Sequence, residues 1–348
     1  MKIDRHSHTT VASPVKLATS TPAHSARRVI SRRLTWCWAF LFSAIAYADA
    51  PSPPAANTPA VAPQAAGSPP VSQPRATGLL RQVIWQLAHG PAFIAKVRET
   101  VWATGRKVVG VGTYEQSGGG SGRFNLQITM HDGDGRHHFQ QISDGKLAWT
   151  RSEVSGHVAL RRVDVGRLAE WVRPSVSPSG VPPRLRIGGW TEMLDTVDRD
   201  YLIRVDSATL QNQPVWVITG SLREQVRAQI LEESGRATWP ALCPTKVRIA
   251  IAAGPDPATG SGELLPTRIE FWSDPILADP QAELSAQPEG RLITLIEIYS
   301  IRAITAPPVE RFRFDNQDAE VNFVNETERY IERFGVELTA SQRRVLQR

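Results

Sequence analysis

The sequence predicts a mainly β protein of the α+β class, built on one large, curved antiparallel sheet with helices covering its concave face. Many segments between residues 92 and 301 alternate polar and apolar residues and are rich in Val, Ile, Thr, Trp and Tyr, as half-buried strands are. Turn sequences such as HDGDG and Asp144-Gly145 join some of these segments as hairpins. Because helices do not alternate with the strands, a doubly wound sheet is excluded. No period of about 20–50 residues recurs, so a propeller or a solenoid is not expected.

The first 48 residues predict a secretory signal peptide, so we expect a periplasmic or otherwise exported protein. Arginine pairs at 27–28 and 32–33 precede an apolar run over 34–45, and Ala46 and Ala48 supply the small residues for cleavage after Ala48. The run is shorter than the roughly 20 residues that span a bilayer, so no stable transmembrane span is expected after cleavage. A retained anchor is the alternative. The second arginine pair also resembles a twin-arginine signal, which leaves the export route open.

Removal of this signal abolishes the net charge of the chain. The sequence has 40 Lys and Arg against 34 Asp and Glu, and residues 1–48 hold seven of the former and one of the latter. The remainder carries 33 of each, whereas a nucleic-acid-binding domain needs a basic excess, so no nucleic-acid partner is expected. Cys243 is then the only cysteine, so no internal disulfide is expected and the fold must depend on its core.

Residues 49–76 are rich in Pro and Ala and predict a disordered linker, and residues 77–348 predict one folded domain. The domain begins with a helix over 77–89, whose apolar residues share one stripe and which ends at Gly90-Pro91. Further helices are expected over 165–172, 189–197, 224–233, 325–334 and 339–347, the last with Thr339 or Ser341 as its N-cap.

The strands are predicted from period-two alternation between turn residues. The clearest is 124–130, in which the even-numbered residues are apolar and should share one buried face, while the odd-numbered residues are polar and should lie on the other. The expected strands are 92–104, 107–116, 124–130, 136–142, 146–149, 157–163, 201–205, 214–222, 245–252, 265–272, 291–301 and 312–314. The expected loops are 117–122, 174–183, 254–262 and 274–290.

Motifs for catalysis or cofactor binding are weak, so no catalytic residue, no metal and no cofactor is expected. Three His and two Asp residues between 131 and 138 could ligate a metal, but we interpret them as a solvated hairpin tip and its flanking strand. The DxDG pattern there has Ser143 where a calcium loop needs Glu. SGGGSG at 117–122 precedes a strand, whereas a phosphate loop precedes a helix. HExxH and a GxSxG elbow at Ser121 or Ser261 are absent from the sequence.

Large apolar residues on both the predicted helices and the predicted strands could fill a core or line a ligand cavity, and the sequence leaves both alternatives open. In the cavity hypothesis, a ligand lies between the sheet and the helices at 165–172 and 189–197. The candidate ligand-binding residues are Phe124, Leu126, Ile128, Met130, Trp149, Trp171, Trp190, Met193 and Leu194.

The order of the elements over residues 92–335 resembles the periplasmic lipoprotein-carrier family, the outer-membrane lipoprotein-sorting proteins of the LolA and LolB type. The segments that carry the resemblance are FIAKVRETVW, GVGTYEQ, GRFNLQITM, the unit Asp144–Trp149, GGWTEMLDTV, YLIRVDSATLQNQPVWVI and LIEIYSIRAITAPPVERFRF. The resemblance implies an unclosed antiparallel barrel with a helical lid, an apolar interior for acyl chains, and Trp149 on the concave side of the sheet. Neither Arg98 nor Arg123 matches the family's lid-contacting arginine, and the chain has extra segments at 174–187, 222–242, 254–262 and 274–290.

We therefore expect a secreted, non-enzymatic binding protein that holds a lipid or an acylated ligand in an apolar cavity. The alternative is an envelope sensor or interaction module with the same fold, which binds a protein partner. A hydrolase is the third hypothesis. The first two differ in the interior, because a carrier needs an open apolar cavity whereas an interaction module has a filled one.

Overall fold

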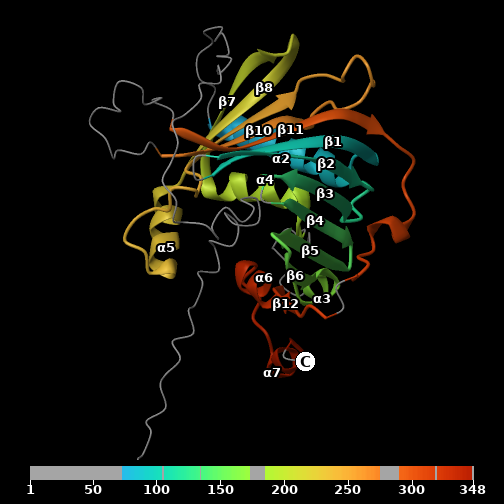
Figure 1. The fold of residues 1–348 in the computed structure, drawn as a ribbon, viewed down its shortest axis with the longest axis vertical. Coiled ribbons are helices and arrows are strands. Elements are labelled where there is room, and N and C mark those ends of the chain that lie inside the picture. The colour runs from blue at the N-terminus through green and yellow to red at the C-terminus, as the bar shows by residue number, and fades with distance from the viewer. Residues whose placement is uncertain are drawn as a thin grey trace, which may run out of the picture.

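The computed structural model describes residues 73–103, 106–133, 135–172, 185–274, 290–317 and 320–346. The predicted signal peptide and its cleavage site lie outside these residues, as do most of the predicted linker, the whole loop at 174–183 and most of the loop at 274–290. The described chain forms one curved sheet of twelve strands that does not close, with helices against it, which confirms the predicted fold class (Figure 1). No described helix has the length and apolarity needed to cross a membrane.

The strands follow the spatial order β12-β6-β5-β4-β3-β2-β1-β11-β10-β9-β8-β7. All adjacent pairs are antiparallel except β12 and β6, which are parallel. Their bounds are β1 Phe93–Ala103, β2 Arg106–Gln116, β3 Arg123–His131, β4 Arg136–Asp144, β5 Leu147–Val154, β6 His157–Asp164, β7 Tyr201–Leu210, β8 Gln213–Leu222, β9 Lys246–Ala252, β10 Pro266–Ser273, β11 Arg291–Ala303 and β12 Phe323–Asn325.

Two of the described helices, α2 and α4, pack against the concave face of the sheet. The described helices are α2 Gln73–His89, α3 Val165–Val172, α4 Gly189–Asp200, α5 Glu224–Ser234, α6 Thr327–Arg333 and α7 Ala340–Leu346. The apolar stripes of α2 and α4 join core-facing residues of β1–β4 and β7–β11 in one cluster, so these two helices cover the concave face (Figure 1). α2 begins at Gln73, within the predicted linker, because Ala76 is fully buried in this core.

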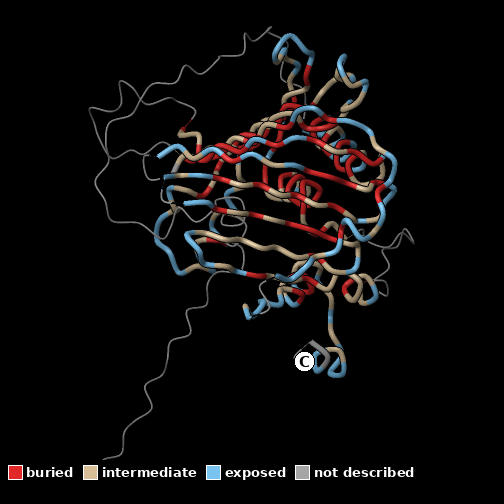
Figure 2. The backbone as a smooth tube through the Cα atoms, turned by 45° about the vertical axis from the view of Figure 1, so that its right-hand side comes forward, coloured by how far each residue is buried: buried red, intermediate tan, exposed pale blue. Residues whose placement is uncertain are grey.

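The predicted alternation of β3 is confirmed. Its even-numbered residues 124–130 are buried, and the odd-numbered residues between them are only partly exposed. Figure 2 shows the same alternation of buried and more exposed positions along several neighbouring strands. The apolar face of β3 therefore packs toward α4, as the period-two pattern requires.

Two predicted elements differ in the structure. Residues 309–312 form a 3₁₀ helix, η2, and Phe312 is buried at the outer, convex face of β3 and β4, so the strand predicted at 312–314 is wrong. α3 does not share the central concave face with α4. It packs near α6 and β5 in a second apolar cluster that includes Leu168 and Tyr330, which corrects the expectation that both helices cover one cavity.

Candidate functional site

The centre of the concave face is a packed core. Seven of the nine candidate ligand-binding residues lie together in it, with exposed fractions between 0 and 4%. They are Phe124, Leu126, Ile128, Met130, Trp190, Met193 and Leu194. The buried stripe of α2 also belongs to this core, and its leucines at 80 and 87 are fully buried. The structure thus brings these seven residues together, and their neighbours are the side chains of two helices.

The start of α4 is held tightly against the sheet. The ring of Trp190 stacks on Tyr114, with 3.8 Å between centroids and 16° between planes. The Tyr114 hydroxyl donates a 2.6 Å hydrogen bond to Gln116, whose amide donates to a backbone carbonyl of α2. Gly188 adopts a φ of 77°, and a Cβ at this position would lie 2.5 Å from Phe124 Cζ. Only glycine allows the chain to pass the Phe124 ring so closely.

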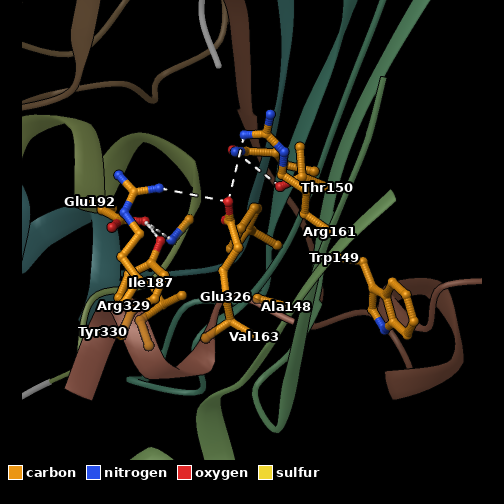
Figure 3. A pocket seen from close by; sticks show the side chains of 13 residues that line it. Ala148, Trp149, Thr150, Arg161, Val163, Ile187, Glu192, Glu326, Arg329 and Tyr330 are labelled. Carbon is orange, nitrogen blue, oxygen red and sulfur yellow. Dashed lines mark hydrogen bonds and ion pairs between the residues drawn. The ribbon is translucent and has the colours of Figure 1, made fainter. Parts of the chain in front are cut away.

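Trp149 lies on the convex side of the sheet, so its expected concave position is wrong. Trp149 pairs with Ile142 and Arg162, whereas the adjacent Ala148 is the residue that faces inward. The Trp149 ring stacks on Phe314 with 4.8 Å between centroids, and Figure 3 shows it pointing away from the inner cluster. A shift of one residue in hairpin register exchanges the two faces of a strand, and alternation alone does not set that register.

Trp171 is also separated from the seven central residues. It packs on the second cluster at α3, and the guanidinium of Arg167 lies 5.9 Å from the centre of its ring. Of the two helices expected to enclose a ligand, only α4 therefore contributes to the central core.

A small cavity lies between the two clusters, lined by residues of β4, β5, β6, α4 and α6 (Figure 3). Its volume is about 40 Å³, which suffices for about three or four water molecules at roughly 10–15 Å³ each. Sites for drug-sized ligands occupy roughly 300–1,000 Å³. An acyl chain does not fit this cavity as it stands.

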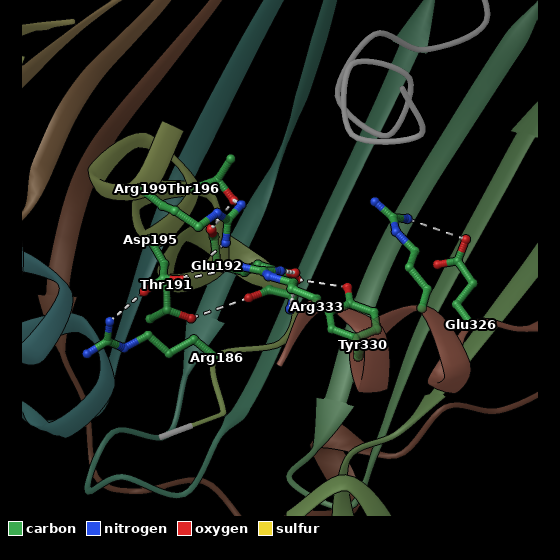
Figure 4. Close-up of polar contacts among 12 residues, drawn as sticks. Arg186, Thr191, Glu192, Asp195, Thr196, Arg199, Glu326, Tyr330 and Arg333 are labelled. Atoms are coloured by element: carbon green, nitrogen blue, oxygen red, sulfur yellow. Dashed lines mark hydrogen bonds and ion pairs between the residues drawn. The ribbon is translucent and has the colours of Figure 1, made fainter. Parts of the chain in front are cut away.

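A buried ionic network adjoins this cavity and joins α4 to α6 (Figure 4). Glu192 forms an ion pair with Arg333 and accepts hydrogen bonds from the Gly188 amide and, at 3.1 Å, from the Tyr330 hydroxyl. Arg333 also lies 3.2 Å from Asp195. Since α4 and α6 are far apart in sequence, these contacts are long-range and hold α6 onto α4.

Burial raises the pKa of Glu192 above its usual value, although Arg333 and the donors from Gly188 and Tyr330 oppose this effect. Burial and the neighbouring Glu192 also raise the pKa of Tyr330. The Glu192 carboxyl thus contacts the Gly188 amide just before α4 and two side chains of α6, Tyr330 and Arg333. The arrangement is therefore suited to fastening two helices together, and breaking one partner would leave a buried charge uncompensated.

Glu99 is a second buried carboxyl, which the sequence interpretation missed. It lies between Val97 and Val101 on the core-facing side of β1 and is 2% exposed. Among the described residues, its Oε1 atom has no hydrogen-bond partner, and the same holds for the Thr294 hydroxyl on the neighbouring strand β11. Burial raises the pKa of Glu99 to about 8. The period-two position of Glu99 in the run FIAKVRETVW was the available signal.

The histidines at the β3–β4 hairpin form no described metal site. His137 Nε2 lies 2.8 Å from Asp132 Oδ2, and His138 Nδ1 lies 3.3 Å from the Thr129 hydroxyl. In the part of the chain that the structure describes, no group of three or more His, Cys, Asp or Glu residues is placed to hold a metal ion.

No protein-family model matches the chain, and no curated protein matches it by sequence. Several solved structures are similar to it over about 70% of its length. The complex of MucA and MucB from Pseudomonas aeruginosa is 12% identical, with 72% of this chain and 63% of that chain covered and a TM-score of 0.32. The lipoprotein LppX from Mycobacterium tuberculosis is 11% identical, with coverages of 67% and 98% and a TM-score of 0.32.

A LolA superfamily protein from Nitrosomonas europaea is 11% identical, with coverages of 69% and 98% and a TM-score of 0.26. The similar structures thus include the superfamily that the sequence resembles. The chain spans about three-fifths of the length of the MucB chains that it matches. At these TM-scores the matches say nothing about the ligand or partner of this chain, which must be inferred from its own residues.

Proposed function

We propose that the protein is a non-catalytic envelope binding protein, and that it acts as an interaction module for a protein partner. The observation that carries this proposal is the filled concave face. α2 and α4 occupy the space that an acyl ligand would need, and the adjoining cavity measures only about 40 Å³. A packed interior leaves the outer surface of the sheet for binding, where Val111, for example, is 56% exposed.

The buried polar groups also favour a non-catalytic role. A catalytic carboxyl must reach a substrate, whereas Glu192 is enclosed by Arg333, Tyr330 and the Gly188 amide. Glu99 lies in the core under the two helices. Neither group has the open cleft that a hydrolase would require.

The experiment that tests this proposal combines two measurements on the protein purified from its own cell envelope. Native mass spectrometry should find no bound lipid, and a series of fatty-acid probes of increasing chain length should not quench tryptophan emission. A photo-crosslinking residue at Val111 should form adducts with protein. If a lipid copurifies, and the affinity for fatty acids rises with chain length, then the interaction-module proposal is wrong.

The lipid-carrier hypothesis is the second candidate, and it is favoured by two buried polar groups, Glu99 and Thr294, each of which has an oxygen without a hydrogen-bond partner among the described residues. Unpaired polar atoms inside an apolar core destabilise the packed state, and in this hypothesis they bind the ester or carboxyl group of a lipid after α2 and α4 move away. In that case the seven central residues form the proposed ligand-binding set, without Trp149 and Trp171, which lie outside the central core. The fatty-acid series above decides between the two candidates, because acyl binding contributes about 0.8 kcal/mol per CH₂ group.

A further inference from the structure

Two arginines line the small cavity between the two apolar clusters. Arg161 on β6 stands in register with Thr150 and lines the cavity from the sheet, whereas Arg329 lines it from α6 (Figure 3). Both approach the same atom, Glu326 Oε1, at 3.7 Å and 3.8 Å respectively. These distances exceed the range of a hydrogen bond. One carboxylate therefore forms only loose ion pairs with two guanidiniums.

The N–H donors of these two guanidiniums need acceptors. The side chain of Arg329 is 18% exposed and that of Arg161 is 33% exposed. Among the described residues, no acceptor forms a hydrogen bond with either guanidinium. Each guanidinium has five N–H donors, and donors that are withdrawn from bulk water are ordinarily hydrogen-bonded. The cavity that both arginines line is the place where an acceptor from outside the protein would satisfy them.

The charges around this cavity favour an anion. Its lining holds four charged side chains, which are Arg161, Arg329, Glu192 and Glu326. Glu192 is already paired with Arg333. The two lining arginines therefore face Glu326 alone, which leaves one positive charge in excess, and a single negative charge in the cavity would balance it.

The rest of the lining suits a ligand that is polar at one end. Thr150 accepts a 3.4 Å hydrogen bond from the Gln141 amide, and its hydroxyl proton has no acceptor among the described residues, so the threonine can donate to a ligand. Apolar side chains complete much of the lining and would contact a methyl group. They are Phe124, Ala148, Val163 and Ile187. The volume of about 40 Å³ corresponds to about three or four non-hydrogen atoms, when each occupies the roughly 10–15 Å³ of a water molecule.

We propose that this cavity binds a small monocarboxylate, of the size of formate or acetate, between Arg161 and Arg329. The planar guanidinium matches a carboxylate in shape and forms strong, charge-assisted hydrogen bonds with it. The bound carboxylate would join β6 to α6 and so add to the contacts that hold α6 in place. Such a site is independent of the interaction-module function, because its ligand contacts β6 and α6 and not the outer surface of the sheet.

The test measures acetate binding to the full mature protein by saturation-transfer NMR, at constant ionic strength in a buffer without other carboxylates. Acetate should bind saturably. Arg161→Gln and Arg329→Gln should each weaken binding at least about tenfold, because each removes one of the two charged donor groups. Two single variants are used so that misfolding of one leaves the other as a test. Arg302→Gln is the matched control, since Arg302 is exposed on β11 and this variant loses the same charge; it should bind acetate as the wild type does.

A second measurement locates the site. A ligand that binds only the folded protein stabilises it, so acetate should raise the thermal midpoint of the wild type and of Arg302→Gln, and leave that of the two cavity variants unchanged. Acetate should also slow hydrogen–deuterium exchange of the amides of α6 in the wild type and leave the amides of β8 unchanged. Protection elsewhere would overturn the proposal.

Two sources of the carboxylate are distinguishable. N-acetyltriglycine ends in a carboxylate, and its C-terminal amide does not. Tighter binding of the acid than of acetate supports the site and assigns it to the end of a peptide chain, whereas weaker binding supports it and assigns it to a free acid. The amide should not bind in either case.

Three results would overturn the proposal. Absence of saturable acetate binding would show that the cavity takes water alone. Competition by chloride at the same concentration as acetate would show a site for any anion, without recognition of a carboxylate. Equal acetate affinity in the wild type and both cavity variants would show that acetate binds elsewhere.

Discussion

Replacing Glu99 by Gln should change how the stability of the protein depends on pH. Burial raises the pKa of the Glu99 carboxyl from 4.5 to about 8. Between these two values the folded protein retains the proton while the unfolded chain loses it, so the free energy of unfolding falls as the pH rises through this window. At about 1.4 kcal/mol per pH unit, this rise in the pKa of Glu99 lowers the free energy of unfolding by roughly 5 kcal/mol by pH 8.

The glutamine side chain of this variant carries no charge at any of these pH values, so the variant lacks this dependence. Urea unfolding of both proteins at about one-unit intervals from mildly acidic to mildly alkaline pH measures the difference. We expect the variant to gain on the wild type until the pH reaches about 8 and then to keep a constant advantage of several kcal/mol. Native domains have about 5–15 kcal/mol in total, so the effect should be visible as a lower urea midpoint for the wild type.

The control is Glu263→Gln, because Glu263 is exposed in the loop before β10. Its stability should follow that of the wild type at every pH. A difference between the wild type and Glu99→Gln that does not vary with pH across this range would show that Glu99 is already charged or solvated in the folded protein. The burial of Glu99 beneath α2 and α4 would then be refuted.

Three further predictions concern the packing of the two faces and the network between α4 and α6. Leu126→Asp should unfold the domain, since Leu126 is 1% exposed. Gln127→Asp, on the other face of β3, should change the free energy of unfolding by less than about 1 kcal/mol. Equal urea midpoints for these two variants would contradict the register of β3. Trp190→Ala should cost about 3–5 kcal/mol, the penalty for truncating an aromatic residue in a filled core, and a clearly smaller loss in the same assay would indicate a cavity wall. Arg333→Ala should cost about 3–5 kcal/mol by leaving the Glu192 carboxyl without its buried partner. It should also speed proteolysis near α6, whereas Arg329→Ala should do neither, because Arg329 lies 3.8 Å from Glu326 in a looser pair.

The sequence by itself determined the class of the fold and most of its elements. Period-two alternation over 124–130 correctly predicted which side chains of β3 are buried, because in a single strand that property depends only on local geometry. Gly90-Pro91 and the apolar stripe that precedes it predicted α2, although the helix begins at Gln73, one turn before the expected start at Thr77. Thr339 acts as an N-cap of α7 through a 3.3 Å bond from the Gln342 amide, which confirms one of the two expected caps.

Tertiary structure decided how these elements meet. Trp149 lies outside because the β4–β5 register places Ala148 opposite Ser143, and a pattern within one strand does not specify its offset from the next. The short apolar run at 312–314 did not distinguish a strand from the end of the 3₁₀ helix η2. The short strand β12 depends on its pairing with β6, which is distant in sequence. Whether large apolar residues fill a core or line a cavity depends on which helices cover the sheet. That outcome was set by long-range packing of α2 and α4 on the sheet, and local sequence patterns carry no information about it.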